Sequence, residues 1–459
     1  MNPEYEALLA EQRKFFQTGT TKDVTFRVNA LKRLRAVIQR RYKDVQKALK
    51  ADLHKCDYET LMCELTCTLD ELNLMIKKTP SYAKKRRVKT PLTIAPGKSY
   101  ILPEPYGTVL IMTAWNYPFS LAMLVLTDAI SAGNCCVIKP SELAPATSHL
   151  VKEIVEECFD PNYVAVIEGG VEETTELLKN RFDFIHYTGS TRVGQIVAKA
   201  AAPHLTPVIL ELGGKSPCII DETANLEIAA KRIAWGNCLN SGQTCVEPDY
   251  LLVKRGMKDT VAKAIWQAIE SFYGKDIQKS PDFGRILNNR NFKRVEALLN
   301  GGHILYGGHV DESDCYIEPT ILDQVDLDSP LMQEEIFGPL LPIVEYDTLE
   351  EALEFVNKRE KPLALYIFSQ NKANQEKVLK HTSSGGVSIN ATILHNASPY
   401  LPFGGVGNSG MGKYHAKAGF DAMSNLRGVF HKSTWLDLAF SYAPFAQKDG
   451  MLKKMYKLK

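Results

Sequence analysis

Short apolar runs alternate with segments of helical length between about residues 106 and 212, and this alternation limits the possible folds more than any other feature. The runs are GTVLIM, NCCVIK, YVAVIE, FDFIHY and PVILEL. Strands that alternate with helices in this way predict a parallel sheet with helical crossover connections. Because ligands of such sheets bind beyond the carboxyl ends of the strands, the residues that follow each run are the first candidates for a functional site.

The rest of the chain predicts a second α/β unit and extended connections. Residues 1 to about 80 have helical periodicity, whereas residues 81–104 are rich in proline and basic residues and predict an extended excursion. After about residue 212, CII and YLLV predict strands, and helices are expected from about Leu226 to Cys238 and from about Asp259 to Tyr273. A chain of 459 residues is too long for one core, so we expect an α/β protein of two or three domains.

Charge and cysteine content exclude several classes of function. The 55 basic and 53 acidic residues give a net charge of +2, which offers no general attraction for nucleic acid or an anionic membrane. The N-terminus has no apolar signal-peptide core, and the longest apolar stretch, near residues 121–130, is too short to span a bilayer. Ten irregularly spaced cysteines are typical of a reducing compartment, so we expect a cytoplasmic protein without stable membrane insertion.

Two basic segments keep alternatives open. KKRR, at residues 84–87, is either a solvated or subunit-facing charge run or a patch for nucleic acid. The tail MLKKMYKLK is either a solvated terminus or a weak membrane contact, and a few charges alone do not anchor a protein stably. Since nothing else in the chain is strongly basic, we expect no nucleic-acid partner.

Two segments at predicted strand ends have the character of a nucleotide site. In TGSTRVG, Gly189 and Ser190 lead into a helix that contains Gly194, and a glycine turn that opens a helix offers N–H groups to a phosphate. The spacing is G-x-x-x-x-G rather than the full dinucleotide fingerprint, so an ordinary strand–turn–helix is an equal alternative. In VIKPSE, Lys139 and Glu142 could grip ribose hydroxyls, or they could form an incidental ion pair on a surface turn.

Three further residues suit covalent catalysis. Cys245 follows the polar turn NSGQT, where converging N–H groups would lower its pKa and increase the thiolate fraction; an inert buried thiol is the alternative. Glu211 ends VILEL beside two glycines and could be a ribose-binding acid, a general base or a solvated glutamate. Asn116, in WNYPF, could donate its amide N–H to an oxyanion or serve only as a turn residue.

A metal site has little support in the sequence. Cys63 and Cys67 could share a helix face, yet no matching His or Cys pair completes a zinc set. His395 has no H-x-x-x-H partner. We therefore expect no metal and assign both cysteines to the core.

Seven motifs occur in order over about residues 105–415 and together closely resemble the aldehyde dehydrogenase superfamily. They are MTAWNYPF, VIKPSE, TGSTRVG, LELGGKSP, NSGQTC, EEIFGPLLPI and LPFGGVGNSGMG. Within the superfamily the chain looks most like the class 3 branch, because PYG precedes TVLIM, Tyr414 follows GMGK and the N-terminus carries no extra length. Members of that branch act on fatty and aromatic aldehydes.

The resemblance implies a role for each matching residue. Cys245 matches the nucleophile, Glu211 matches the general base rather than a ribose ligand, and Asn116 matches the oxyanion amide. Tyr117 and Phe403 match positions that line the substrate site. The matches to cofactor contacts are Lys139 and Glu142 at the adenosine ribose, Gly189, Ser190 and Gly194 near the pyrophosphate, and Glu335 and Phe337 near the nicotinamide ribose.

The implied activity is oxidation of a small-molecule aldehyde, medium- or long-chain aliphatic or aromatic, to its acid through a cysteine thiohemiacetal and a thioester. The carboxylate of Glu142 near a ribose 2′ position favours NAD, while class 3 relatives also accept NADP. Two rival readings are a CoA-acylating enzyme, against which Glu211 argues, and a non-catalytic protein that kept the fold. The intact set of Cys245, Glu211 and Asn116 argues against the second rival.

The resemblance also implies a division of the chain. A Rossmann-like dinucleotide-binding domain is expected in residues 1–80 and 105–210, and a second α/β domain, the catalytic one, in residues 211–420. Residues 81–104 and 421–459 resemble the small β oligomerisation element and the bridging segments of the family. These segments imply a homodimer.

Overall fold

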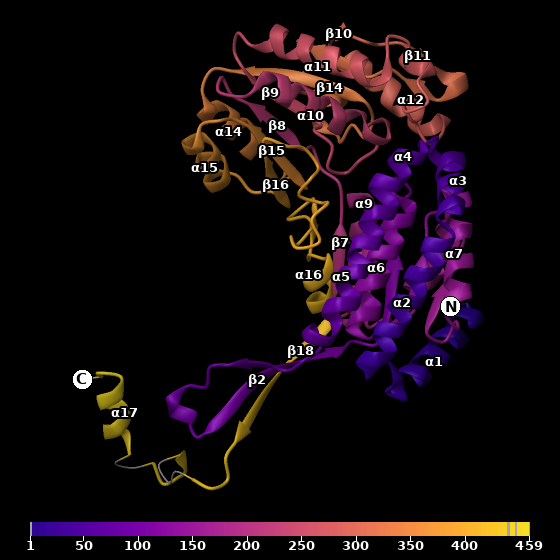
Figure 1. Cartoon of the computed structure of the whole chain (residues 1–459). Helices are drawn as coiled ribbons and strands as arrows, with labels where there is room; N and C mark the ends of the chain where they lie inside the picture. Colours follow the sequence, from indigo (N-terminus) through magenta and orange to yellow (C-terminus); the bar gives the residue numbers. More distant parts are fainter. Residues whose placement is uncertain (1, 438–440, 446–447, 459) are drawn as a thin grey trace.

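Three sheets organise the part of the chain that the structure describes. The computed structural model describes residues 2–437, 441–445 and 448–458. Within these residues, a six-stranded sheet has the order β17-β7-β6-β3-β4-β5 and a seven-stranded sheet has the order β10-β13-β14-β9-β8-β15-β16. A three-stranded sheet, β1-β2-β18, projects away from both (Figure 1).

The predicted apolar runs form the six-stranded sheet. Its parallel strands are β3 (Thr108–Met112), β4 (Cys135–Lys139), β5 (Val164–Val166), β6 (Phe184–Thr188) and β7 (Val208–Glu211). The short β17 (Gly410–Met411) pairs antiparallel with β7, so residues from late in the chain complete this sheet. All residues of β3, β4 and β6 are buried, as expected for a parallel sheet covered on both faces.

Helices from the N-terminal 82 residues cover this sheet together with its crossover helices. The N-terminal helices are α1 (Pro3–Gln17), α2 (Val24–Arg40), α3 (Tyr42–Leu53), α4 (Asp57–Thr60) and α5 (Cys67–Tyr82), with a π-helical turn, η2 (Leu61–Thr66), between the last two. The crossover helices are α6 (Pro118–Ala132), α7 (Pro145–Cys158), α8 (Val171–Leu178) and α9 (Thr191–Ala201). Every residue of α6 is buried, because it packs against β3 and β4 and also against α2 and α5.

The seven-stranded sheet forms the second unit. Its strands are β8 (Pro217–Ile220), β9 (Tyr250–Lys254), β10 (His303–Tyr306), β13 (Thr320–Asp323), β14 (Leu340–Tyr346), β15 (Ala364–Phe368) and β16 (Gly386–Ile389). Its helices are α10 (Leu226–Cys238), α11 (Lys258–Tyr273), α12 (Asn289–Leu298), α13 (Pro330–Gln333), α14 (Leu349–Asn357) and α15 (Lys372–His381). A two-stranded ladder joins β11 (Val310–Asp311) to β12 (Tyr316–Ile317). The strands predicted at CII and YLLV and both predicted helices are confirmed.

The projecting sheet joins the two segments that the sequence sets apart. It consists of β1 (Arg86–Val88), β2 (Gly97–Pro105) and β18 (Ser424–Lys432), and β2 pairs with β18 along nine residue pairs. Before β18, α16 (Ala416–Ala422) packs on α5 and α6; after it, α17 (Asp449–Met455) lies near the C-terminus (Figure 1). The predicted bridging range 421–459 includes residues 438–440, 446–447 and 459, which lie outside the described residues. The domain boundaries stay a prediction.

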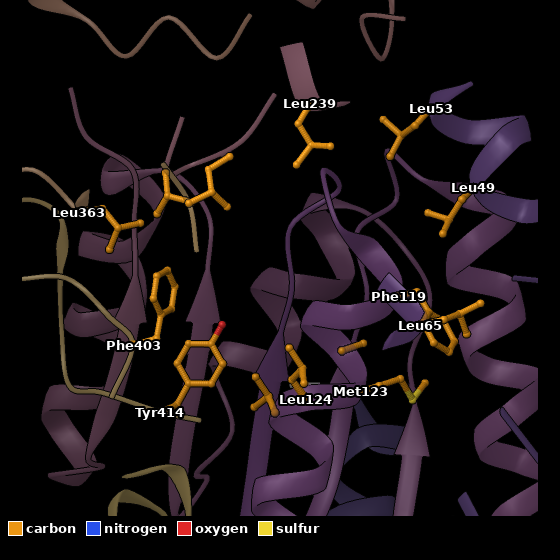
Figure 2. Close-up of a cluster of buried hydrophobic side chains, with 14 of the residues drawn as sticks. Leu49, Leu53, Leu65, Phe119, Met123, Leu124, Leu239, Leu363, Phe403 and Tyr414 are labelled. Atoms are coloured by element: carbon orange, nitrogen blue, oxygen red, sulfur yellow. The ribbon is translucent and has the colours of Figure 1, made fainter. Parts of the chain in front are cut away.

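A single hydrophobic cluster connects the two larger sheets. Figure 2 shows buried side chains of this cluster from the N-terminal helices, α6 and the second unit, with Phe403 and Tyr414 near Leu363 on one side and Phe119 near Leu65 on the other. Phe403 and Tyr414 also pair through their backbones, with N···O distances of 3.1 and 2.8 Å. Because side chains from both units are packed in one core, the two units are held in a fixed relative position.

Candidate active site

Two cavities meet where the two α/β units face each other. The apolar cavity, of about 1030 Å³, is lined by the π-helical turn, α5, α6, α10 and the loop at residues 393–399, with side chains that include Met62, Leu121, Leu124, Trp235, Leu239 and Phe403. The sheet-edge cavity, of about 720 Å³, lies at the carboxyl ends of β3, β6 and β7. Among the described residues, Asn116, Glu211 and Cys245 are the ones that line both cavities.

Cys245 lies on a loop with an unusual backbone. The three residues Asn240, Ser241 and Gly242 all have positive φ, at 52°, 52° and 73°. Positive φ is costly for residues with a side chain, and such strain concentrates at functional sites. A Cβ on Gly242 would lie 2.3 Å from the carbonyl carbon of Gly338, so only glycine fits there. The loop therefore holds the half-buried Cys245 thiol between the cavities.

The surroundings of Cys245 raise its pKa, contrary to the effect expected from its turn. Burial is the largest cause, and the carboxylates of Glu211 and Glu335 add to it. From the sequence, only the turn next to Cys245 could be assigned as its neighbour, because Glu211 and Glu335 are distant from it in the chain. At neutral pH the thiol is therefore protonated, and its activation needs a base.

Glu211 is a buried acid at the end of β7. Its side chain is 1% exposed, which excludes the solvated-glutamate interpretation. Neither carboxyl oxygen has a hydrogen-bond partner among the described residues. Burial and repulsion by Glu335 raise the pKa of Glu211 to about 8, and the ammonium of Lys413 partly offsets them. An acid with this pKa, open to both cavities, can exchange protons near neutral pH.

Asn116 is held by its backbone and its side chain at once. It follows β3 and precedes α6, and its Nδ2 donates to the Gln243 carbonyl at 3.1 Å. Since an amide nitrogen carries two N–H bonds, one donor is left for a ligand. The adjacent Tyr117 lines the apolar cavity, and its hydroxyl lies 2.7 Å from Thr244 Oγ1.

The glycine turn forms one wall of the sheet-edge cavity. Gly189 and Ser190 line that cavity, and Ser190 caps α9 by accepting a 3.5 Å hydrogen bond from the Val193 N–H. A Cβ on Gly189 would lie 2.2 Å from the Tyr187 hydroxyl, and one on Gly194 would lie 2.7 Å from Leu212. Gly194 thus lets α9 approach Leu212 closely, and the residues at the positive N-terminal end of α9 line the cavity.

Glu335 and Phe337 close the other side of the sheet-edge cavity. Oε1 of Glu335 is buried without a hydrogen-bond partner among the described residues, and burial raises the pKa of Glu335 to about 8. Phe337 has a φ of 51°, and its ring lies 5.2 Å from that of Trp115 in an edge-on arrangement. A buried acceptor without a partner suits a ligand hydroxyl, and the strained Phe337 is fixed over the same cavity.

Lys139 and Glu142 lie at the same sheet edge but outside the two cavities. Lys139 ends β4 and is buried, and its Nζ donates to the Pro140 carbonyl at 2.7 Å. Nζ lies 3.6 Å from Oε2 of the more exposed Glu142. The surface-turn alternative is thus partly right, because the ion pair exists, although its ammonium is not at the surface.

Several residues of the site were not anticipated from the sequence. Lys413 donates to the carbonyls of Gly385 and Gly404. Its positive charge also lowers the pKa of Glu211 by stabilising the ionised carboxylate. Tyr414, noted above only as a branch marker, lines the apolar cavity. The sequence signal for both residues was their position directly after the glycine-rich run NSGMG. Cys63 and Cys67, assigned to the core, line the apolar cavity instead.

Comparison with known proteins decides the family. The model of the aldehyde dehydrogenase family matches residues 2–429. The chain belongs to the aldehyde dehydrogenase family. Accordingly, the protein is an NAD(P)-dependent aldehyde dehydrogenase, an oxidoreductase that converts aldehydes to carboxylic acids. The α/β fold prediction and the class 3 resemblance are both confirmed.

Relatives cover nearly the whole chain. A 4,4'-diaponeurosporen-aldehyde dehydrogenase of Staphylococcus aureus is 46% identical over 449 residues, which are 97% of this chain and 98% of the relative. A dimeric NADP-preferring aldehyde dehydrogenase of Canis lupus familiaris is 49% identical over 416 residues, 90% of this chain and 92% of the relative. A solved structure of Staphylococcus aureus AldH in a substrate-bound state superposes with a TM-score of 0.96 at 46% identity, and covers 99% of this chain and all of that one.

Among the described residues, no helix is both long enough and apolar enough to cross a bilayer.

Alkylation of Cys245 tests the electrostatics of the site. Because burial and two acids raise its pKa, we expect the rate of iodoacetamide labelling at Cys245 to increase continuously from pH 7 to pH 9. Glu211→Gln removes one of these charges and should accelerate labelling at pH 9, where Glu211 is ionised. Peptide mass spectrometry separates Cys245 from the other nine cysteines. A labelling rate that is already constant above pH 7 would contradict the raised pKa.

Proposed function

We propose that this enzyme oxidises aldehydes through covalent catalysis, with Cys245 as nucleophile, Glu211 as general base and Asn116 as oxyanion donor. The observation that carries the proposal is that these three residues, far apart in the sequence, line both cavities. Transfer of a hydride from an aldehyde in one cavity to a cofactor in the other has to take place where the cavities meet. The side chains at that place are a thiol, a buried acid and an amide donor.

The sheet-edge cavity suits a nicotinamide dinucleotide. Its walls offer the N-terminal end of α9 beside Gly189 and Ser190 for a pyrophosphate, and the unpartnered Glu335 oxygen for a ribose hydroxyl. Phe337 would contact the nicotinamide end, and Lys139 and Glu142, along the same sheet edge, would hold the adenosine ribose. When bound, the dinucleotide supplies a two-electron hydride acceptor.

The first half of the reaction forms a bond to sulfur. Glu211 takes the proton of the Cys245 thiol, and the sulfur adds to the carbonyl carbon of the aldehyde. The C–S bond forms while the electrons of the C=O double bond move to oxygen. The free N–H of Asn116 and the backbone N–H of Cys245 donate to this oxyanion. The thiohemiacetal then loses its C–H hydrogen with both bonding electrons, and the carbon becomes a thioester.

The second half of the reaction is hydrolysis. Glu211, returned to its ionised form by loss of its proton to solvent, takes a proton from a water molecule. The hydroxide adds to the thioester carbon, the C–S bond breaks, and its electrons leave with Cys245 as a thiolate. The carboxylic acid is released, and the two electrons of the oxidation have left as hydride.

The apolar cavity supports a medium- or long-chain aliphatic or an aromatic aldehyde as substrate. Its walls carry leucine, methionine and aromatic side chains, among them Tyr117 and Phe403. On the cofactor side, we propose that NAD is preferred and NADP is accepted. The carboxylate of Glu142 would repel a 2′-phosphate, whereas Lys139, 3.6 Å away, reduces that repulsion.

Removal of the nucleophile and of the base gives two distinct results. Cys245→Ala should abolish aldehyde oxidation while dinucleotide binding, measured by fluorescence, is retained. For the parent enzyme we expect kcat/KM to increase about tenfold per pH unit below pH 8 and to level off above it, because only ionised Glu211 acts as a base. Glu211→Gln should lower kcat by about 10²-fold or more and remove the levelling-off above pH 8, because the rate then follows ionisation of the Cys245 thiol, whose pKa is raised. Turnover by Cys245→Ala would disprove covalent catalysis at this residue.

A kinetic panel tests substrate and cofactor choice together. With linear aldehydes of increasing length, kcat/KM should increase about fourfold for each methylene buried in the apolar cavity, until the cavity is filled. Aromatic aldehydes should be oxidised, and NAD should give a higher kcat/KM than NADP. Glu142→Gln should narrow the difference between the two dinucleotides. A preference for acetaldehyde over long-chain aldehydes would contradict the proposed substrate class.

We also propose that the enzyme is a homodimer formed around the three-stranded sheet. The sheet projects from the molecule, β18 is its edge strand, and apolar side chains near it are exposed, among them Leu426, Phe430 and Trp435. Exposed strand edges and apolar patches are features of subunit contacts.

Light scattering after size-exclusion chromatography measures the assembly directly. We expect a mass of twice 51.3 kDa, and Leu426→Lys should shift the protein towards the monomer because it places a charge on the apolar surface. A monomeric mass for the parent protein at micromolar concentration would exclude the dimer.

A further inference from the structure

A fully buried lysine lies directly behind Asn116. Lys55 is in the short link between α3 and α4, and its side chain is 0% exposed. Its Nζ donates to Glu64 Oε1 at 2.8 Å and to the backbone carbonyl of Asn116 at 2.8 Å, and it lies 3.9 Å from the centre of the Tyr117 ring. An ammonium has three N–H donors, and these three contacts supply a carboxylate, a carbonyl and an aromatic face.

Glu64, the ion-pair partner of Lys55, holds the chain a few residues after Asn116. Glu64 is also 0% exposed, and its second oxygen, Oε2, accepts a 2.8 Å hydrogen bond from the backbone N–H of Ser120. The ion pair therefore fixes the chain at Asn116 and again at Ser120, the start of α6. Glu64 is presented by the π-helical turn Leu61–Thr66, a distortion that is rare in helices and frequent at functional sites.

The same network reaches the nucleophile loop. The carbonyl oxygen of Asn116 accepts a second hydrogen bond, 2.9 Å long, from Asn240 Nδ2. The backbone N–H of Asn240 in turn donates to Glu59 Oε1 at 3.0 Å. Lys55 and Asn240 thus meet at one carbonyl oxygen, which joins the Asn116 segment to the strained loop that leads to Cys245.

Stability alone is a weak explanation for this ion pair. Burial of two opposite charges is expensive, and well-packed apolar side chains of similar volume often stabilise a core as much or more. In some proteins a buried polar or ionic group instead fixes one geometry. Here the geometry in question is that of Asn116, because its carbonyl is held by Lys55 and its Nδ2 by Gln243, so the direction of the remaining N–H is fixed.

We propose that Lys55 and Glu64 are positioning residues for the reaction: their buried ion pair orients the Asn116 amide towards the oxyanion. The inference rests on the proposed function, in which Asn116 stabilises that oxyanion. Neither Lys55 nor Glu64 is assigned contact with substrate or cofactor; both act through Asn116 and the start of α6.

The test removes both charges together, so that neither is left buried alone. In Lys55→Met/Glu64→Gln, we expect the single-turnover rate constant for formation of reduced nicotinamide, measured with enzyme in excess, to fall about tenfold or more. The concentration of active enzyme is determined by iodoacetamide titration of Cys245. The Kd of the dinucleotide should change less than twofold. Glu64→Gln alone, which keeps the shape of the side chain, should lower the rate at least threefold and covers the case in which the double variant does not fold.

Two matched variants make the result decisive. Lys258→Met/Asp323→Asn removes another ion pair, 2.5 Å long, on the far unit, and should lower the melting temperature without change in the rate per titrated site. Asn116→Ala is the reference for loss of the oxyanion donor. The positioning role is overturned if Asn116→Ala lowers the single-turnover rate constant but the Lys55 and Glu64 variants stay within twofold of the parent. It is also overturned if these variants lose titratable sites while the rate constant per site is unchanged. If Asn116→Ala itself is unchanged, the proposed function fails, and the inference with it.

Discussion

The active site depends on the common direction of β3, β6 and β7. Because these strands are parallel neighbours, they end at one edge of the sheet, and the residues that follow them converge there. Asn116, Gly189 and Glu211 are separated by up to 95 residues in the chain, yet each comes at or just after the end of one of these strands. The second unit then needs to supply only one loop, with Cys245, to complete the set.

Burial at this edge determines the proton chemistry. The same exclusion of water that makes the core raises the pKa values of Glu211 and Glu335 to about 8 and raises that of Cys245. An isolated thiol in these surroundings would be inert. Since the buried acid beside it also holds its proton until about pH 8, proton transfer between the two groups is far less costly than it would be to an ordinary carboxylate.

Much of this arrangement could be predicted from the sequence, and the reason differs between residues. The strands and helices followed from apolar runs and their spacing, and Cys245, Glu211 and Asn116 followed from motifs with strong local patterns. The pKa of Cys245 was expected to fall, because the sequence shows the turn before the thiol but not the acids that fold against it. Lys55 gave no signal at all, since a lysine in the polar link LHKCDYE has the sequence character of a solvated residue. Its burial results from contacts with Glu64 of the π-helical turn and with Asn116 and Tyr117 before α6, which no short segment encodes.

The buried network and the reactive groups impose opposite demands on one region. Hydrogen bonds join Lys55, Glu64, Asn116 and Asn240 into one network and restrict their positions, although Asn240 Oδ1 has no partner among the described residues. Glu211, which lines both cavities, is left without a hydrogen-bond partner among the described residues, and burial together with repulsion by Glu335 raises its pKa. A satisfied donor set suits a group whose direction has to be constant, such as the amide that meets the oxyanion. An unsatisfied acid suits a group that gains and loses a proton in every cycle. The fold places both kinds of group around one thiol. Residues with satisfied polar groups position the reacting groups, and residues with unsatisfied ones take part in the proton transfers.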